Sequence, residues 1–398
     1  MDIRKAEERD RKAVEGLWSY CFEQEDDPFF QWYFSKVCRM DEVLLGEEAG
    51  AVACDLHRRP YKLSLRGKVF DTDYIVGVAT HPAARGRGLA SALLQAVFRK
   101  AADEGKPAVI LMPSAASFYR PLGFSFYVHQ WQRKASPEHL SAMGERALRA
   151  GAVTSAEEWS LLAGIYEAFT KGHTGYSLRD EASWRLHMEG QLREGYIAVV
   201  YDEKGPAGYL CYNLSGRELI ASEMAWASEA GRKGLYAYMA GHLGSIDRCT
   251  WYEPLDDRSF LFWPDGAEHT YVENRTFPFM MARVTDGAAL ISGIAAPEEL
   301  EGTLSFILSD SLLPEACGIY TVTAEKGRLT ARRDDEASAS LSLDAGALAS
   351  LLFGAAGIEE LLAGGQAVWE EGRKDQKQVL SFLKQAFPRR ATWINEWY

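Results

Sequence analysis

The stretch from Asp73 to Tyr127 decides the fold of this chain: DYIVGVATHPAARGRGLASALLQAVFRKAADEGKPAVILMPSAASFYRPLGFSFY. It opens with an apolar strand, Tyr74 to Ala79, which runs into a turn rich in Gly and Arg, RGRGLA at residues 85–90. From Leu89 onward, apolar residues recur at helical spacing. The order predicts a strand, a tight turn and an amphipathic helix.

This turn has the chemistry of an anion site. Unpaired backbone N–H groups gather at a helix N-terminus, where the helix dipole also favours negative charge. Gly86, Gly88 and the small Ala90 let a phosphate approach the main chain, and Arg85 and Arg87 add positive charge. The dinucleotide fingerprint does not match, because it requires Gly-x-Gly-x-x-Gly in a βαβ unit. A Walker loop is excluded because no Gly-Lys-Ser/Thr closes the turn.

A second motif follows about 25 residues later. The apolar strand Ala108 to Met112 leads into SAASFYRPLGF at residues 114–124. Together the two segments resemble motifs A and B of the GCN5-related N-acetyltransferases (GNATs), with Arg/Gln-x-x-Gly-x-Gly/Ala matched by Arg85 to Ala90. A lone Gly/Arg-rich turn is usually an ordinary strand-to-helix loop. Two motifs in the right order and context favour the family instead.

Composition limits the class of protein. A chain of 398 residues exceeds a single core and should form two or three domains. The net charge of −12 argues against nucleic acid and suits a cationic substrate. No apolar run approaches the ~20 residues of a membrane helix, and the charged N-terminus does not resemble a signal peptide. The six cysteines lack metal spacing, so we expect reduced thiols, no metal and a cytoplasmic protein.

Three segments follow from the pattern. Residues 1–130 read as a complete acetyltransferase domain, 131–284 as a worn second copy and 285–398 as an α+β domain of short strands and helices. The first segment is predicted to contain strands at 43–46, 51–56, 61–65 and 74–79 after two helical stretches. From about residue 281 the pattern changes, and strands are predicted at 280–284, 302–309, 318–324 and 328–332, with helices at 348–353, 358–363 and 374–386.

The second copy lacks the chemistry of the first. A hairpin, 196–201 with 207–214, precedes a strand at 219–227 and a turn, SEAGRKGLY, at residues 228–236. Setting Gly234 against Gly88 places Gly231 where Arg85 stands and Tyr236 where Ala90 stands. A bulky Tyr236 would obstruct a phosphate, so we predict that this copy is structural and binds no cofactor.

The whole arrangement resembles the enhanced-intracellular-survival (Eis) acetyltransferases, whose third domain is similar to sterol carrier protein 2 (SCP2). The implied fold class is α/β and α+β: tandem GNAT folds, the first functional and the second degenerate, followed by an SCP2-like α+β domain. The resemblance also implies a homohexamer and acetyl-CoA as cosubstrate.

The resemblance assigns roles to residues of this chain. It implies that the backbone of Val78, Ala79 and Thr80 pairs with the pantetheine arm, with the Val78 amide as oxyanion donor. The pyrophosphate would lie on residues 85–91, namely Arg85, Gly86, Arg87, Gly88, Leu89, Ala90 and Ser91, and the channel would continue along Ser114 and Ala115.

Acid and base follow from the same resemblance. Tyr119 stands at the general-acid position, although a core aromatic is its ordinary alternative. In the Eis proteins the C-terminal carboxylate enters the first active site, and here Tyr398 supplies it. A tail docked on its own domain is the alternative for Tyr398. His81 competes as base, but we expect it to be a turn histidine.

The residues that would contact the acceptor belong to no motif. Asp26, Phe30, Trp32 and Glu396 are the candidate substrate contacts, although the acidic turn at Asp26 could simply be solvated. The prediction is an acetyl-CoA-dependent N-acetyltransferase for amino groups of cationic acceptors, of aminoglycoside, polyamine or lysine type, by direct transfer in a ternary complex. The alternative is a ligand- or lipid-binding protein using the SCP2-like domain, with a non-catalytic, acetyl-CoA-sensing first domain.

Overall fold

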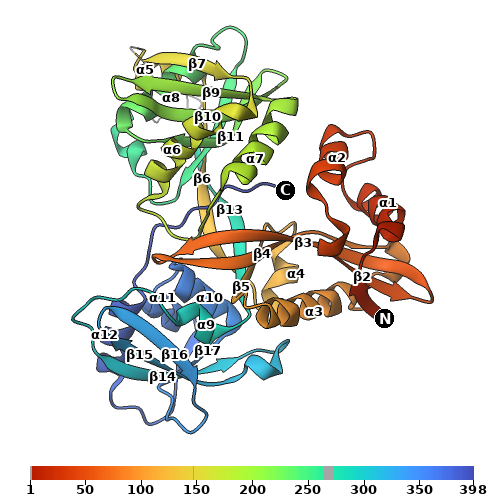
Figure 1. Cartoon of the computed structure of the whole chain (residues 1–398). Coiled ribbons are helices and arrows are strands. Elements are labelled where there is room, and N and C mark those ends of the chain that lie inside the picture. The colour runs from red at the N-terminus through yellow and green to blue at the C-terminus, as the bar shows by residue number, and fades with distance from the viewer. Residues whose placement is uncertain (1, 147, 264–271) are drawn as a thin grey trace.

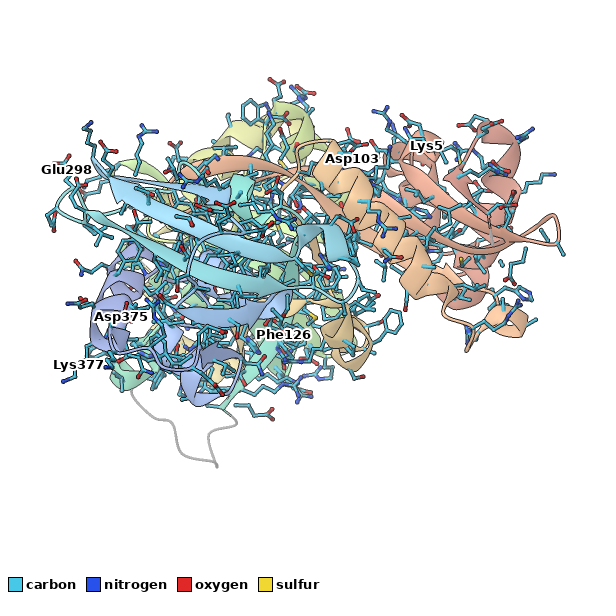
Figure 2. All side chains as sticks on the ribbon, turned by 90° about the horizontal axis from the view of Figure 1, so that it is seen from below. Lys5, Asp103, Phe126, Glu298, Asp375 and Lys377 are labelled. Carbon is cyan, nitrogen blue, oxygen red and sulfur yellow. The ribbon has the colours of Figure 1, made fainter. Side chains whose placement is uncertain are left out.

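The computed structural model describes residues 2–146, 148–263 and 272–398. They form a large twisted sheet that passes through two α/β units and a smaller sheet covered by helices near the C-terminus (Figure 1). Charged side chains such as Lys5, Asp103, Glu298 and Lys377 project outward around the molecule (Figure 2). No helix in the described ranges is long and apolar enough to cross a membrane.

The first unit contains strands β1 (Asp2–Lys5), β2 (Val43–Glu48), β3 (Ala51–Leu65), β4 (Lys68–Thr80), β5 (Ala108–Leu111) and β6 (Ser125–Ala135). Its helices are α1 (Arg11–Cys21), α2 (Pro28–Trp32), α3 (Leu89–Asp103) and α4 (Ala116–Tyr119). A π-helical turn, Tyr33–Val37, continues α2.

The hairpin of β3 and β4 is much longer than its sequence suggested. The two strands predicted at 51–56 and 61–65 are one strand, β3, because Pro60 pairs within the ladder opposite Asp73 rather than ending it. Arg66, at the hairpin tip, donates from Nη2 to the carbonyls of Leu351 and Pro388, at 2.9 and 2.8 Å. The hairpin therefore fixes the C-terminal unit to the first unit.

The second unit contains strands β7 (Arg149–Val153), β8 (Tyr176–Ser177), β9 (Tyr196–Asp202), β10 (Gly205–Ser215), β11 (Glu218–Trp226), β12 (Arg248–Pro254) and β13 (Glu273–Val284). Its helices are α5 (Pro137–Met143), α6 (Trp159–Thr170), α7 (Glu181–Glu194) and α8 (Glu229–Ala240). The predicted hairpin of β9 and β10 is confirmed.

Strand exchange joins the two units into one sheet, in the order β1-β2-β3-β4-β5-β13-β6-β12-β11-β10-β9-β7, with β8 paired to β3. β13 lies between β5 and β6, and β6 is also paired with β12. The strand predicted at 280–284 therefore belongs to this sheet, as the end of β13, and not to the C-terminal sheet.

The C-terminal unit has a sheet in the order β16-β15-β14-β17-β18. Its strands are β14 (Gly302–Ser309), β15 (Gly318–Glu325), β16 (Arg328–Arg333), β17 (Leu341–Asp344) and β18 (Ala367–Trp369). Its helices are α9 (Gly287–Ile291), α10 (Ala345–Phe353), α11 (Ile358–Ala363) and α12 (Gln376–Ala386). The predicted strands at 302–309, 318–324 and 328–332 and the three predicted helices are confirmed, whereas β17 and β18 were not predicted.

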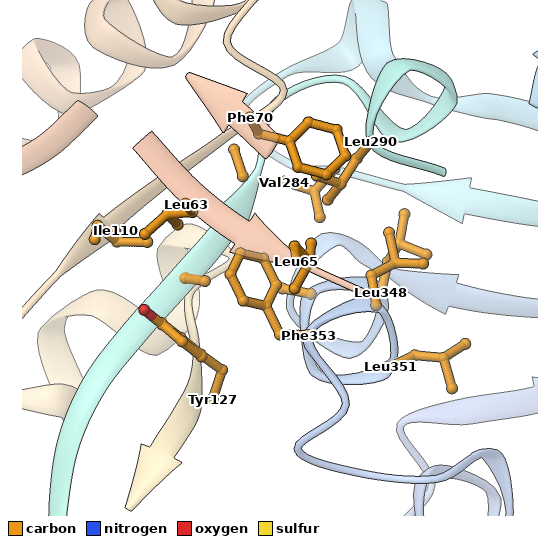
Figure 3. Close-up of a cluster of buried hydrophobic side chains, with 14 of the residues drawn as sticks. Leu63, Leu65, Phe70, Ile110, Tyr127, Val284, Leu290, Leu348, Leu351 and Phe353 are labelled. Carbon is orange, nitrogen blue, oxygen red and sulfur yellow. The ribbon is translucent and has the colours of Figure 1, made fainter. Parts of the chain in front are cut away.

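One apolar core spans the first and C-terminal units. Leu63 and Leu65 of β3, Phe70 of β4 and Leu348 and Phe353 of α10 lie in the same cluster of buried side chains (Figure 3). The apolar side chains of the β3–β4 hairpin and of α10 are removed from water together. This burial stabilises the contact between the first and C-terminal units by the same hydrophobic effect that stabilises the interior of a single domain.

The packing of Gly77 in β4 leads to a first prediction. Gly77 has φ +58°, and a Cβ there would lie 2.3 Å from Cζ3 of Trp18. Gly105 has φ +72°, and a Cβ added there would meet nothing within 4 Å. We expect Gly105→Ala to lower the free energy of unfolding by about 1 kcal/mol through its left-handed backbone, and Gly77→Ala by roughly 2 kcal/mol more through overpacking. Equal losses in urea unfolding would contradict the Trp18 contact.

Candidate active site

Strands β4 and β5 separate soon after they meet. Their parallel ladder has only two residue pairs, Asp73 with Val109 and Tyr74 with Ile110. Beyond Tyr74, the edge of β4 that faces β5 has no ladder partner in the described chain. An edge of free N–H and C=O groups can pair with an extended ligand as a further strand would.

Along the same stretch of β4, a bulge interrupts the ladder with β3 on the other edge. Asp55 pairs with Ala79 and His57 with Val76, so Leu56 of β3 faces two residues of β4, Gly77 and Val78. The extra residue turns the backbone of β4 locally. Val78 and Thr80 are half-buried there, and Ala79 is buried.

The N-terminus of α3 opens beside the end of β4. Gly86 and Gly88 both have φ +76°, and added Cβ atoms would meet nothing within 4 Å. No side chain caps α3, and its first described internal bond runs from Ala92 N to Gly88 O, at 3.0 Å. The preceding N–H groups are therefore available to an anion.

The two arginines of the turn have partners of their own. Arg87 forms an ion pair with Glu48, at 2.6 Å, and Arg85 donates from Nε to the carbonyl of Thr80, at 3.1 Å. Both side chains remain exposed. The backbone of the turn, more than free arginine charge, makes this end of α3 receptive to an anion.

Tyr119 lies on the α3 side of the sheet, 7% exposed, against Phe118 and Phe124. Burial raises the pKa of its phenol to about 12, although a hydrogen bond with Ser114 works in the opposite direction. The phenol is therefore fully protonated at neutral pH and able to donate. Ser114 and Ala115 are exposed in the loop between β5 and α4.

The C-terminal tail crosses from the second unit to the first. Asn395 and Trp397 both donate from their side chains to the carbonyl of Ser222 on β11, at 2.8 and 3.1 Å. Tyr74 then donates from its hydroxyl to the carbonyl of Glu396, at 2.9 Å. The chain ends between α7 and the first unit (Figure 1).

Tyr398 occupies an aromatic corner of the first unit. Its ring centroid lies 5.2 Å from that of Tyr74 and 6.4 Å from that of Tyr33. Its hydroxyl is 3.1 Å from that of Tyr61, and the guanidinium carbon of Arg59 stands 4.6 Å from its ring centroid. These contacts hold the last residue on the face of β4 opposite Tyr119.

A cavity of about 510 Å³ opens at this corner. Its walls come from α2, the middle of β3, α7, β10, β11 and the last three residues of the chain. Trp32 of α2 closes it against α7, where a Cβ on Gly190 would lie 2.9 Å from the indole. Both α/β units and the tail thus contribute to one cavity of the size that holds a small molecule.

A buried ion network fixes the tail in this cavity. Arg179 donates to Glu396 at 2.9 Å and to Glu223 at 3.0 Å, and its side chain is 3% exposed. Ser177 and Tyr61 also donate to the carboxylate of Glu396. Burial alone would raise the pKa of Glu223, but Arg179 and His187 outweigh it and hold the value at about 2.

Residues 2–127 and residues 175–284 each match a model described as an acetyltransferase (GNAT) domain, and residues 288–395 match a sterol carrier protein domain. The chain is a tandem GNAT acetyltransferase. No curated protein matches its sequence.

Several solved structures share the fold of this acetyltransferase over its full length. A GCN5-related N-acetyltransferase from Anabaena variabilis has 19% identity, full coverage of both chains and a TM-score of 0.86. A probable N-acyltransferase from Enterococcus faecalis has 20% identity, covers 100% of this chain and 99% of its own, and has a TM-score of 0.87. Eis1 from Mycobacterium abscessus has 16% identity, full coverage of both chains and a TM-score of 0.76. The Eis-like architecture is therefore confirmed.

The second GNAT unit has the same parting of strands but a different helix start. β11 and β12 pair only at residues 218–220 and 248–250. Helix α8 begins at Glu229, and Ser228 caps it by accepting from Gly231 N, at 3.1 Å. A Cβ on Gly231 would lie 2.0 Å from the carbonyl oxygen of Ala207, so this glycine serves close helix–strand packing.

The alignment of Gly234 with Gly88 is therefore wrong. Gly234 lies inside α8, whereas Gly88 precedes α3. Tyr236 does not obstruct a phosphate site either, because it is 2% exposed in the core and donates to Glu253 at 2.6 Å. The features that disfavour an anion are the Ser228 cap and the acidic Glu229 in the first turn.

The predicted acceptor residues separate into two groups. Trp32 and Glu396 line the cavity, but Glu396 is engaged by Arg179. Phe30 is 6% exposed and packs on Phe34, with ring centroids 4.6 Å apart, because the phase of α2 turns Phe29 toward the cavity instead. Asp26 is exposed in the turn before α2 and lies outside the cavity wall. Phe29, and not the predicted Phe30, therefore lines the cavity.

The competing base, His81, is exposed and its Nδ1 accepts from Ala83 N, at 3.3 Å. This is the turn histidine that the sequence predicted. It stabilises the 3₁₀ turn before Arg85.

Sequence reasoning missed Arg59, Tyr61, Arg179 and His187 on the cavity wall. Arg59 fell between the strands predicted at 51–56 and 61–65, and Tyr61 began the second of them without a functional role. Arg179 and His187 lie in the second unit, far from any motif. The alternation of Tyr61, Leu63 and Leu65 with polar residues was the signal for the face of Tyr61, whereas no such pattern marks Arg59.

One group that extends from His187 on the cavity wall into the second unit has the donors for a metal ion. The ligand atoms of His187, Cys211 and Glu223 lie within 4.8 Å of one another in the described chain. Arg179 already bonds both carboxylate oxygens of Glu223, at 3.0 and 3.2 Å. A cation at this point would have to compete with that guanidinium.

Two buried titratable side chains of β3 face α1. Both carboxyl oxygens of Asp55 and Nε2 of His57 have no hydrogen-bond partner among the described residues. Burial raises the pKa of Asp55 well above its ordinary value and lowers that of His57 to about 3, where Arg59 adds to the effect. Burial therefore favours the neutral form of both side chains in the folded protein.

Asp55 yields a prediction with a defined sign. We expect the folded state to keep the proton of Asp55, whereas the unfolded chain releases it above pH ~4. The unfolded state then binds fewer protons than the folded state, so the free energy of unfolding falls as pH rises, by roughly 1 kcal/mol per pH unit. Asp55→Asn removes this dependence, and its stability relative to the native protein should grow from pH 5 to pH 7 in urea titrations. Asp103→Asn, at an exposed position of α3, is the control. A difference independent of pH would show that Asp55 is ionised when folded.

Proposed function

We propose that this protein transfers the acetyl group of acetyl-CoA to an amino group of a cationic acceptor, by direct attack in a ternary complex. The observation that carries the proposal is the parting of β4 from β5 beside an uncapped α3. A thioester lying along the free edge of β4 would have its pyrophosphate at the start of α3. The acceptor would enter from the cavity on the opposite face.

The cofactor contacts follow from this placement. The backbone of Val78, Ala79 and Thr80 would pair with the pantetheine arm, and residues 85–91 would bind the pyrophosphate. Ser114 and Ala115 would line the channel. The Val78 amide, at the bulge, would stabilise the oxyanion of the tetrahedral intermediate.

Two groups of the chain would manage the protons. The C-terminal carboxylate of Tyr398 would accept one proton from the acceptor ammonium, giving the neutral amine that attacks the thioester carbonyl. The C–N bond forms, the C–S bond breaks, and Tyr119 would donate to the leaving thiolate. The second proton of the amine leaves as the amide forms and restores the phenol. The net release is one proton per turnover.

The acceptor class is the finer part of the proposal. An aminoglycoside, a polyamine or a lysine amine would each enter as a cation. Exposed acids at the cavity, Asp71, Asp180 and Glu194, support attraction of such a molecule. Trp32 would contact the acceptor, and Asp26 would act only at a distance. A cytoplasmic homohexamer, implied by the Eis resemblance, belongs to the same proposal and is tested by light scattering.

The cofactor site predicts a selective loss of binding. Gly88→Val places a branched side chain at the phosphate approach, and we expect the Kd of acetyl-CoA to rise at least about 100-fold, because backbone N–H contacts are lost. Gly105→Val is the matched control, with the same left-handed backbone and the same open surroundings at the far end of α3. Calorimetry should give one acetyl-CoA per chain for the native protein. Unchanged affinity in Gly88→Val, or two sites per chain, would overturn the assignment.

The tail predicts a loss of turnover without a loss of cofactor affinity. Deleting Tyr398 moves the terminal carboxylate roughly 3.5 Å back along the chain, beyond the ~3 Å at which a base can reach its proton. We expect kcat to fall at least about 100-fold. Tyr398→Ala keeps a terminal carboxylate and should lose less, through weaker anchoring among Tyr33, Tyr61 and Tyr74. Full turnover of the deletion variant would remove the tail from the chemistry.

A further inference from the structure

Arg59 is an unpaired cation on the wall of the acceptor cavity. It is half-buried in the middle of β3, and its guanidinium carbon lies 4.6 Å from the ring centroid of Tyr398 and 5.6 Å from that of Tyr61. Its Nη1 atom is buried with no hydrogen-bond partner in the part of the chain that the structure describes. No ion pair within the described ranges includes Arg59 either.

Neighbouring arginines differ from Arg59 in this respect. Arg58, one residue earlier on the opposite face of β3, bonds Asp73 at 2.7 Å and also pairs with Glu104. Arg179, across the cavity, bonds Glu223 and Glu396. A guanidinium that loses water without gaining an anion is costly, and two aromatic rings replace only part of that hydration.

We propose that Arg59 binds an anionic group of the acceptor, so that the acceptor is a zwitterion carrying a carboxylate or a phosphate beside its amine. This inference rests on the proposed function and narrows its acceptor class. A guanidinium recognises carboxylate and phosphate oxygens in a bidentate manner. Lys62 lies on the same cavity wall and adds positive charge.

The register places the two ends of such an acceptor. Arg59 pairs with Tyr74, the last residue of β4 that has a partner on β5. The free edge of β4, where the thioester would lie, begins at the next residue. An anion held by Arg59 therefore sets the amine at the start of that edge, near the end of the chain at Tyr398. This arrangement suits a compact zwitterion better than a polycation.

The test compares acceptors that differ only in the anion. Lysine against lysinamide tests a carboxylate, and O-phosphoethanolamine against ethanolamine tests a phosphate. Thiol release gives kcat/KM, and quenching of tryptophan fluorescence in the CoA-loaded enzyme gives binding, because Trp32 and Trp397 line the cavity. We expect the anionic member of at least one pair to be favoured about tenfold or more in both readouts, and the favoured pair names the anion.

Variants then assign the preference to Arg59. Arg59→Met should bring the ratio within the favoured pair to about 1, and Arg59→Lys should restore part of it. Arg193→Met removes another arginine of the same cavity, one that donates to the carbonyl of Pro28, and should leave the ratio unchanged. If Arg59→Met lowers turnover equally for both members, Arg59 serves the terminal carboxylate and the inference is wrong.

Failure of this inference is distinguishable from failure of the proposed function. Acetylation of all four amines without preference for an anion would overturn the role of Arg59 and leave acetyl transfer intact. Binding that prefers the anion and depends on Arg59, without acetylation of any amine, would support the inference and overturn the proposed acetyl transfer. Equal binding of both members of each pair by the native enzyme would overturn the inference directly.

Discussion

The insertion of β13 between β5 and β6 is the constraint on which the rest of the structure depends. Thirteen strands become one sheet because β6 pairs with β13 and, further along, with β12. The orientation of the two GNAT units is then set by backbone hydrogen bonds and not by a flexible linker. This rigidity lets α2 of one unit and α7 of the other form opposite walls of a single cavity.

The C-terminal tail contacts both GNAT units, so its position depends on their fixed orientation. Residues 394–397 bond to the first unit and to Ser222 of the second, and Arg179 neutralises Glu396 inside the protein. Removing one partner from such a buried pair leaves an uncompensated charge, so the network specifies one position for the tail. The position of Tyr398 is therefore determined by contacts of three separated segments, with Arg59 and Tyr61 on β3, Tyr74 on β4 and Arg179 before α7.

What the sequence predicted and what it missed have a common physical origin. The turn at 85–90, the start of α3 at Leu89 and the bounds of β14 depend on local backbone preferences, and these predictions are confirmed. The predicted break at residues 57–60 is absent, because a ladder tolerates Pro60 where the N–H that proline lacks is not required. Arg59, Arg179 and Phe29 reach the cavity through pairing and helix phase between distant segments, which one sequence does not reveal.

The two GNAT units differ in the backbone and side chains at the N-terminus of the helix that follows the parting strands, α3 in the first and α8 in the second. In both, the strand before the helix parts from its parallel neighbour after two or three residue pairs. In the first, Gly86 and Gly88 leave the N–H groups of α3 uncovered; in the second, Ser228 satisfies one such group and Glu229 repels anions. The second unit nevertheless remains essential to the site, because its α7, β10 and β11 complete the cavity and hold the tail. Its contribution to the cavity comes from these walls and does not depend on an uncapped helix N-terminus.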